Sequence, residues 1–312
     1  MLNTEYRNMN AEKTLTNIAF GECFNGIKPL RNSVFLACLP ARQVLYSIVF
    51  AAFLLSSHIT TAQSLESLYT GLENATSISV AANSIYVVEQ GKDRVLKLDL
   101  SGNVLDTFGG RGSGEYQLSK PVDVDATNGL KIFVTDQNNR RIQVFDRRGQ
   151  FLSSISERAS FENSRNYEPD QLSVTDSGEI YFWDAGSRLI RRFDVDYNFE
   201  DEFRISTEIR SFDDMWVSLT EILILDLKSQ TIHRLFPNGG FAGFYPAEGV
   251  KAFHVNDEGF WRAFENRVEL EQDDKTTLSI TYNEVLQPVD MHVLSGKIFI
   301  LTSEELYKLE IK

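Results

Sequence analysis

The chain has 312 residues, of which 42% are hydrophobic and 24% are charged, a composition that excludes a disordered or fibrous protein. Residues 63–312 hold 26 basic and 41 acidic residues, so this part of the chain carries a net charge of −15. A polyanion would be repelled by that charge, which argues against a nucleic-acid partner.

The N-terminal region contains a short apolar segment. Residues 44–55, VLYSIVFAAFLL, hold no charge, Arg42 precedes them, and small residues follow up to Ala62. This pattern predicts a secretory signal peptide that is cleaved after Ala62. Twelve residues are too few to span a bilayer comfortably, so an uncleaved anchor at 44–55 is the less favoured alternative.

These features predict two parts, an extension with signal peptide at 1–62 and a folded domain at 63–312. We expect the protein to be exported to a periplasmic or extracellular location, or else held at the membrane by an uncleaved 44–55 segment. Cleavage would remove both cysteines, Cys23 and Cys38, so the mature protein would form no disulfide.

The folded domain is built from repeats. Short apolar strands that end in a polar or aromatic residue recur six times, at 85–89, 132–136, 180–184, 222–226, 260–264 and 298–302. Their starts are separated by 47, 48, 42, 38 and 38 residues, which is the spacing of four-stranded propeller blades. A third strand with alternating apolar residues follows each of them, as Val95 to Leu98 does in the first repeat.

The last repeat ends at Lys312 directly after its third strand, so it lacks a fourth strand of its own. The segment Ser67–Leu72 precedes the first repeat and can supply that strand. We therefore predict an all-β, six-bladed β-propeller of four-stranded antiparallel blades, closed by an N-terminal strand that leaves no open edge in the ring.

Residues 109–152 contain a glycine-rich approach, a proline at the first strand, an aspartate after the second strand and a basic-apolar third strand. This segment resembles the NHL repeat, and the resemblance extends with decreasing detail over the chain beyond residue 70. It implies a six-bladed propeller. The family includes binding modules as well as enzymes, so the resemblance leaves the activity open.

One position on the innermost strands collects polar and aromatic residues. An alignment of the six first strands places at this position Ser79, Asp123, Ser173, Trp216, His254 and His292. His254 and His292 come from neighbouring blades, so we expect them to lie close together near the channel. With Asp123 or Asp290 they could hold zinc with an open coordination position, or act as bases in a hydrolysis.

The favoured alternative is structural. Polar residues at this position satisfy backbone groups along a wet channel, and a metal needs more ligands than the two histidines. Trp216 is the candidate for ligand stacking, whereas the aromatic residues of the second strands, Tyr181 to Trp183 and Trp261, are expected between blades. His233, on a third strand, is expected to be a surface or packing residue.

Some propellers similar to the NHL type are lactonases or amidating lyases that use calcium or zinc in the channel, and this resemblance supplies the competing hypothesis. Our leading prediction is an exported, monomeric binding scaffold for a protein, peptide or glycan, with no cofactor and no catalysis. The alternative is a metal-dependent hydrolase or lyase, with calcium or zinc held by His254, His292 and Asp290.

Overall fold

The second strands of five repeats are buried on both faces, that of the fifth repeat is buried on one face and half-buried on the other, and this packing joins the repeats into a ring. In the computed structural model, which describes residues 59–127, 129–156, 166–273 and 275–311, Ile85 and Val87 pack against the sixth repeat. Tyr86 and Val88, which point the other way, pack against the second. Neither face is stable in water, so every repeat needs a neighbour on both sides.

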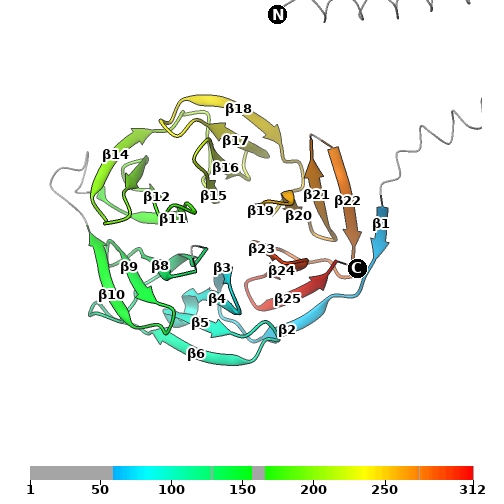
Figure 1. Ribbon diagram of the computed structural model, residues 1–312, viewed down its shortest axis with the longest axis horizontal. Coiled ribbons are helices and arrows are strands. Elements are labelled where there is room, and N and C mark those ends of the chain that lie inside the picture. Colours follow the sequence, from blue (N-terminus) through cyan, green and yellow to red (C-terminus); the bar gives the residue numbers. More distant parts are fainter. Residues whose placement is uncertain (1–58, 128, 157–165, 274, 312) are drawn as a thin grey trace, which may run out of the picture. The chain divides into compact units, whose positions relative to one another are not determined.

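Six antiparallel sheets form the blades of a β-propeller, as the sequence predicted (Figure 1). Blade 1 contains β3 (Ala75–Ala81), β4 (Ser84–Glu89), β5 (Arg94–Leu98) and β6 (Val104–Gly109). Blade 2 contains β7 (Pro121–Asp125), β8 (Lys131–Asp136), β9 (Arg141–Asp146) and β10 (Phe151–Ser156). Blade 3 contains β11 (Pro169–Val174), β12 (Ile180–Asp184), β13 (Leu189–Phe193) and β14 (Phe199–Arg204).

The remaining blades follow the same plan. Blade 4 contains β15 (Asp214–Val217), β16 (Ile222–Asp226), β17 (Thr231–Leu235) and β18 (Phe241–Pro246). Blade 5 contains β19 (Ala252–Asn256), β20 (Gly259–Ala263), β21 (Arg267–Gln272) and β22 (Lys275–Thr281). Blade 6 contains β23 (Asp290–Leu294), β24 (Lys297–Leu301) and β25 (Glu305–Glu310). A short 3-10 helix, η1 (Gln90–Lys92), follows β4, and no helix within the described ranges is long and apolar enough to cross a membrane.

The predicted closure is confirmed. Strand β2 (Glu66–Thr70) pairs antiparallel with β25 and becomes the outer strand of blade 6. Strand β1 (Ile59–Ala62) pairs in parallel with β22 as a fifth strand on the outer edge of blade 5. Cleavage after Ala62 would remove β1 and leave the closing strand β2 intact. The apolar segment 44–55 lies outside the described residues.

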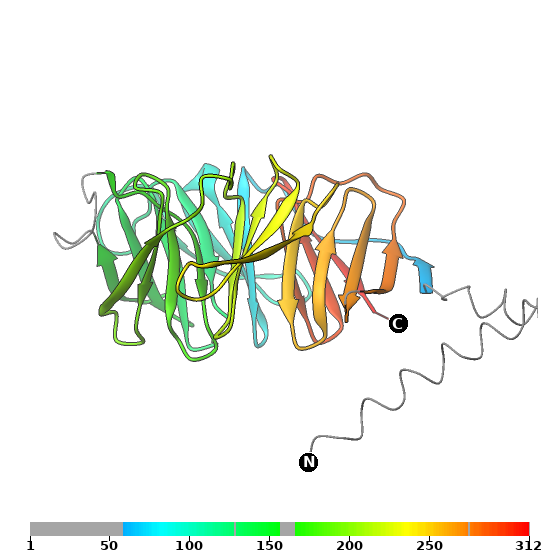
Figure 2. The same cartoon turned by 90° about the horizontal axis from the view of Figure 1, so that it is seen from above.

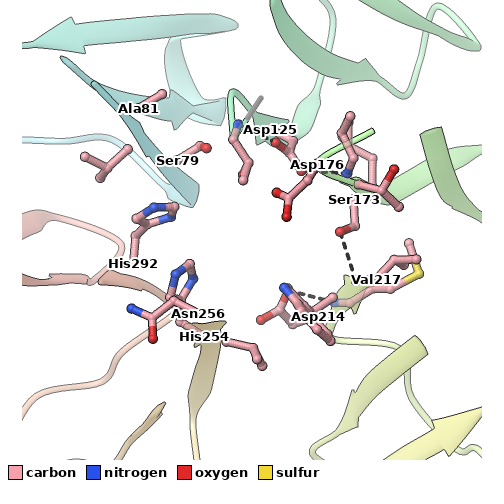
Figure 3. Close-up of a pocket in the computed structure, with 18 of the residues that line it drawn as sticks. Ser79, Ala81, Asp125, Ser173, Asp176, Asp214, Val217, His254, Asn256 and His292 are labelled. Carbon is pink, nitrogen blue, oxygen red and sulfur yellow. Dashed lines mark hydrogen bonds between the residues drawn. The ribbon is translucent and has the colours of Figure 1, made fainter. Parts of the chain in front are cut away.

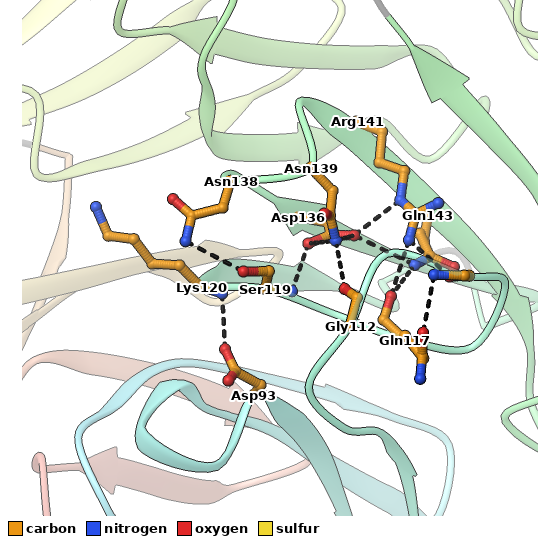
Figure 4. A network of polar contacts seen from close by, with 11 residues as sticks. Asp93, Gly112, Gln117, Ser119, Lys120, Asp136, Asn138, Asn139, Arg141 and Gln143 are labelled. Carbon is orange, nitrogen blue, oxygen red and sulfur yellow. Dashed lines mark hydrogen bonds and ion pairs between the residues drawn. The ribbon is translucent and has the colours of Figure 1, made fainter.

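The acid at the end of the second strand fixes the incoming loop to its blade. It is fully buried in blades 1 to 4, as Glu89, Asp136, Asp184 and Asp226. Asp136 accepts hydrogen bonds from the Ser119 backbone N–H, Asn139 Nδ2 and Arg141 Nε (Figure 4). Asp184 similarly accepts the Glu168 N–H and pairs with the buried Arg191. The aspartate of the repeat therefore serves the fold.

The aromatic residues of the second strands lie in the inter-blade core, as expected. Tyr181, Phe182, Trp183 and Trp261 are at most 4% exposed, and Trp183 stacks on Phe212 with ring centroids 4.5 Å apart. His233 is also buried, and its Nε2 lies 3.0 Å from the Thr231 hydroxyl and 3.5 Å from Asp226 Oδ2. This is the packing role predicted for it.

The strands of a blade run between the two faces of the ring, as the side view in Figure 2 shows. We call the face at which each first strand ends the distal face, and the opposite one the proximal face. Because neighbouring strands are antiparallel, the turns between first and second strands and between third and fourth strands both lie on the distal face.

Candidate functional site

The first strands line the centre of the ring, and strand pairing decides which of their residues share a level. In five blades, one first-strand residue pairs with the second residue of the apolar second-strand segment, as Ser79 pairs with Tyr86. These residues are Ser79, Ser173, Trp216, His254 and His292. In blade 2 the residue with this pairing is Asp125, which pairs with Phe133. The alignment that placed Asp123 at this level is therefore wrong by two residues, because it made the turn between β7 and β8 two residues too long, whereas Val124 pairs with Val134 and Asp125 with Phe133.

Asp123 belongs to a second level, nearer the proximal face. This level also contains Ser77, Asp214 and Asp290, each two residues before its partner in the first level. Asp290 is thus separated by one level from the imidazoles with which it was expected to act. Asp214 was not predicted from the sequence, although the shared pattern of Asp214-Met-Trp-Val and Asp290-Met-His-Val indicates it.

Most side chains of both levels hydrogen-bond to the backbone of the next blade. At the first level, Ser79 Oγ accepts the Ala126 N–H, Asp125 Oδ2 accepts the Val174 N–H, and Ser173 Oγ accepts the Val217 N–H. At the second level, Asp123 Oδ2 accepts the Leu172 N–H and Asp290 Oδ2 accepts the Ile78 N–H. First strands have one edge without a β partner, and these side chains satisfy the polar groups along that edge.

The two predicted histidines are neighbours. Their ring centroids are 4.1 Å apart at an interplanar angle of 45°, and both rings line the channel (Figure 3). The His254 ring faces the backbone of Val293 and the His292 ring that of Val80, so they continue the inter-blade pattern. Burial lowers the pKa of His254 to about 4, and burial together with His254 lowers the pKa of His292 well below its usual value. Both rings are therefore neutral at neutral pH.

The carboxyl groups of the second level influence one another. Burial raises the pKa of Asp123 to about 6, although the Leu172 N–H and the Ser77 hydroxyl donate to it. Burial and then the charge of Asp123 raise the pKa of Asp214 to about 8. Burial and the charge of Asp214 raise the pKa of Asp290 well above its usual value. At neutral pH this level therefore retains protons that free aspartates would release.

A cavity of about 640 Å³ extends from the second level to the first-to-second turns of the distal face. Asp125, Asp176 and Asp214 lie on one wall of it, and the two imidazoles lie on the opposite wall (Figure 3). Trp216 is half-buried, packs against the core between blades 4 and 5, and lines the cavity, which is where a stacking residue was expected. The exposed Leu219 forms part of the rim.

The residues fit a catalytic metal poorly in this arrangement. Among the described residues, no three His, Cys, Asp or Glu side chains converge as a ligand set. The Asp290 carboxylate lies at another level than the imidazoles and is bonded there to the Ile78 N–H. A zinc or calcium site at His254, His292 and Asp290 would require Asp290 to leave this bond and reach the level of the imidazoles.

Comparison with known proteins identifies relatives of the repeat. No protein-family model matches the chain. Over 128 residues, 40% of this chain, the sequence is 30% identical to the human E3 ubiquitin-protein ligase NHLRC1. The rat protein of the same name is 26% identical over an equal length. The match spans 31% of these relatives, so the chain corresponds to about a third of their length.

Solved structures share the fold at low sequence identity. A gluconolactonase from Xanthomonas campestris has a TM-score of 0.61 and 16% identity, over 80% of this chain and 89% of that chain. A virginiamycin B lyase from Staphylococcus aureus has a TM-score of 0.52 and 13% identity, over 80% of this chain and 88% of that chain. Identities this low show a common architecture and leave the chemistry of the channel to its own residues.

Proposed function

We propose that this chain, which is an NHL-repeat β-propeller, is a binding module that holds a peptide segment of a partner protein on its distal face. The observation that supports this most is the difference between the deep part and the outer part of the channel. The polar side chains of the deep part of the cavity bond to neighbouring blades, while its outer part opens on the distal face with carboxylate and apolar groups at its wall and rim.

The cavity favours a particular kind of segment. Its volume of about 640 Å³ lies within the range of sites that enclose several side chains. Asp176 on the wall attracts a basic side chain, and Leu219, which is 71% exposed on the rim, offers an apolar contact. A peptide with a lysine or arginine beside an apolar residue would meet both groups.

Peptides selected from a random displayed library on the purified protein test this proposal. We expect the Leu219→Asp variant to weaken the selected peptides at least about ten-fold, because it buries a charge at the rim contact. The matched control is Val285→Asp, since Val285 is 72% exposed on the loop before β23, at the proximal face. Fluorescence polarisation measures both affinities.

The proposal fails if no peptide is enriched. It also fails if Leu219→Asp and Val285→Asp bind the selected peptides with equal affinity, because the distal face would then not be the site. Thermal melts of the two variants, which are expected to match the parent, exclude unfolding as a cause of lost binding.

A further inference from the structure

A second cavity, of about 570 Å³, lies between blades 1 and 2 on the distal face. Its walls are the first-to-second turns of both blades and the third-to-fourth turn of blade 2. Buried Tyr86 lines it, with Lys97 Nζ 5.7 Å from the ring centroid. Ala81 and Ala82 line this cavity and the central cavity alike, so one ligand on the distal face can reach both.

The lining of this cavity is basic in an acidic protein. Three cationic side chains contribute to it, namely Lys97, Arg147 and Arg148, whereas Lys131 also lines the cavity but has its Nζ 4.6 Å from the ring centroid of Tyr197 in blade 3. The carboxylate in the lining, Asp146, accepts the backbone N–H groups of Arg148 and Gln150 and so stabilises its own turn. The cavity therefore presents an excess of positive charge to a ligand.

Comparison between blades shows that Lys97 is not paired as its equivalents are. The same third-strand position carries Arg192 in blade 3, Arg234 in blade 4 and Lys308 in blade 6. These cations form ion pairs with Glu200, Glu221 and Glu66, respectively. Lys97 forms no ion pair with a carboxylate in the described part of the chain and donates instead to the Arg147 carbonyl oxygen.

The two arginines are also particular to this turn. Blade 3 builds the same turn on Asp194 with Val195 and Asp196 at the corresponding positions, and its aspartate makes the same backbone bonds. The turn therefore forms without arginines. Arg147 and Arg148 are both exposed, and neither forms an ion pair with a carboxylate in residues 59–311 as far as these are described.

We propose that the cavity between blades 1 and 2 binds the carboxylates of a short acidic segment in a peptide ligand. That the carboxylates belong to a peptide rests on the proposed function. The anion site itself is inferred from the charged residues that line the cavity. A nucleic acid would extend its phosphates over the neighbouring carboxylate-lined cavity and the acidic surface, where they would be repelled. A short segment places its charges in the basic cavity alone.

The probe is a fluorescein-labelled peptide Gly-Ser-Glu-Glu-Glu-Glu-Ser-Gly, compared with its glutamine counterpart and with a pentauridylate that carries four phosphates. We expect saturable binding of the glutamate peptide at low salt, and at least about ten-fold weaker binding to the Arg147→Gln/Arg148→Gln variant and to Lys97→Gln. The first of these variants changes only exposed side chains, so its fold is not at risk.

Arg234→Gln is the matched control, because it removes one positive charge at the position equivalent to Lys97 where Glu221 already neutralises it. The inference is overturned if Arg234→Gln and Lys97→Gln weaken the peptide equally, if no binding occurs, or if pentauridylate binds at least as tightly. Leu219→Asp should bind the glutamate peptide normally. A protein that binds this probe but no library peptide would contradict the proposed function alone. A protein that binds library peptides but not this probe would contradict the anion site alone.

Discussion

At the scale of single residues, the channel derives its properties from burial of ionisable groups. Asp214 receives a hydrogen bond from its neighbour Met215 N–H but, among the described residues, no bond from the next blade, unlike Asp123 and Asp290. Burial and the charge of Asp123 then raise the pKa of Asp214 to about 8. Its ionised form is consequently less stabilised than that of Asp123, whose pKa is raised to about 6.

This arrangement predicts a pH-dependent effect of Asp214→Asn. Between the ordinary aspartate pKa near 4 and the folded value of about 8, the folded state keeps a proton that the unfolded state has lost. The unfolding free energy therefore falls as pH rises through this window. Asparagine cannot ionise, so we expect the variant to be more stable than the parent by roughly 1–3 kcal/mol at pH 8.5 and nearly equal to it below pH 4.

Urea unfolding at a series of pH values measures this difference. Asp257→Asn removes the same charge from an exposed turn and should leave the pH profile nearly unchanged, because solvent screens that site. A constant offset between Asp214→Asn and the parent at every pH would contradict the assignment, since it would show that the effect does not arise from titration.

At the scale of the blade, the buried acid of the second strand connects loop, strand and third-strand arginine. Asp136 joins the Ser119 N–H, Asn139 and Arg141, and its replacement by asparagine leaves the arginine without its charge partner. We expect Asp136→Asn to lower the unfolding free energy by about 2–4 kcal/mol, measured by urea denaturation.

Asp99→Asn is the control for that experiment. Asp99 is an aspartate of the third-to-fourth turn in blade 1, and it bonds to the nearby N–H groups of Ser101 and Asn103. Its loss affects one turn in solvent, so a smaller effect is expected. Equal destabilisation by the two variants would show that Asp136 acts as a local turn residue only.

The closing strand gives a prediction for chain truncation. A fragment that begins at Gln63 lacks β1 but retains β2, so it should melt cooperatively at nearly the temperature of a fragment that begins at Ser57. A fragment that begins at Gly71 lacks β2 and should lose cooperative melting, because β25 would be left as an open edge. Differential scanning calorimetry distinguishes the three, and equal melting of all would exclude closure by β2.

At the scale of the whole molecule, the channel is formed by all six first strands. Whether it can bind a metal depends on how these strands place their side chains relative to one another. Since no three potential ligands converge among the described residues and Asp290 lies one level away from the imidazoles, we expect the purified protein to contain less than one equivalent of zinc or calcium. Its melting temperature should not change with a chelator. Elemental analysis and thermal melts measure both quantities.

The His254→Ala/His292→Ala variant completes this test. Stoichiometric metal that is absent from the variant, or that a chelator removes with a fall in melting temperature, would favour the hydrolase or lyase alternative and justify a substrate screen. Without such metal, the variant should differ from the parent only through the lost contacts of the two imidazoles with each other and with the neighbouring backbone.

The sequence by itself determined the number of blades, their strands and the closure by β2, because these follow from local alternation and from a spacing that recurs along the chain. It also placed His254 and His292 on adjacent first strands. It did not determine the level of Asp123, because the alternation of apolar residues at Val122, Val124 and Ala126 fits two registers that differ by two residues, and only the pairing of Asp125 with Phe133 selects one.

Only the tertiary structure decided which polar groups are already bonded. The free edge of a first strand meets its donors and acceptors from another blade about 45 residues away, as Ser79 meets Ala126 at a separation of 47 residues. The lack of a carboxylate partner for Lys97 among the described residues likewise depends on the tertiary structure, which places its equivalents in three other blades beside carboxylates. Charge neutralisation depends on distance in space, and a repeat sequence states only the order of its residues along the chain.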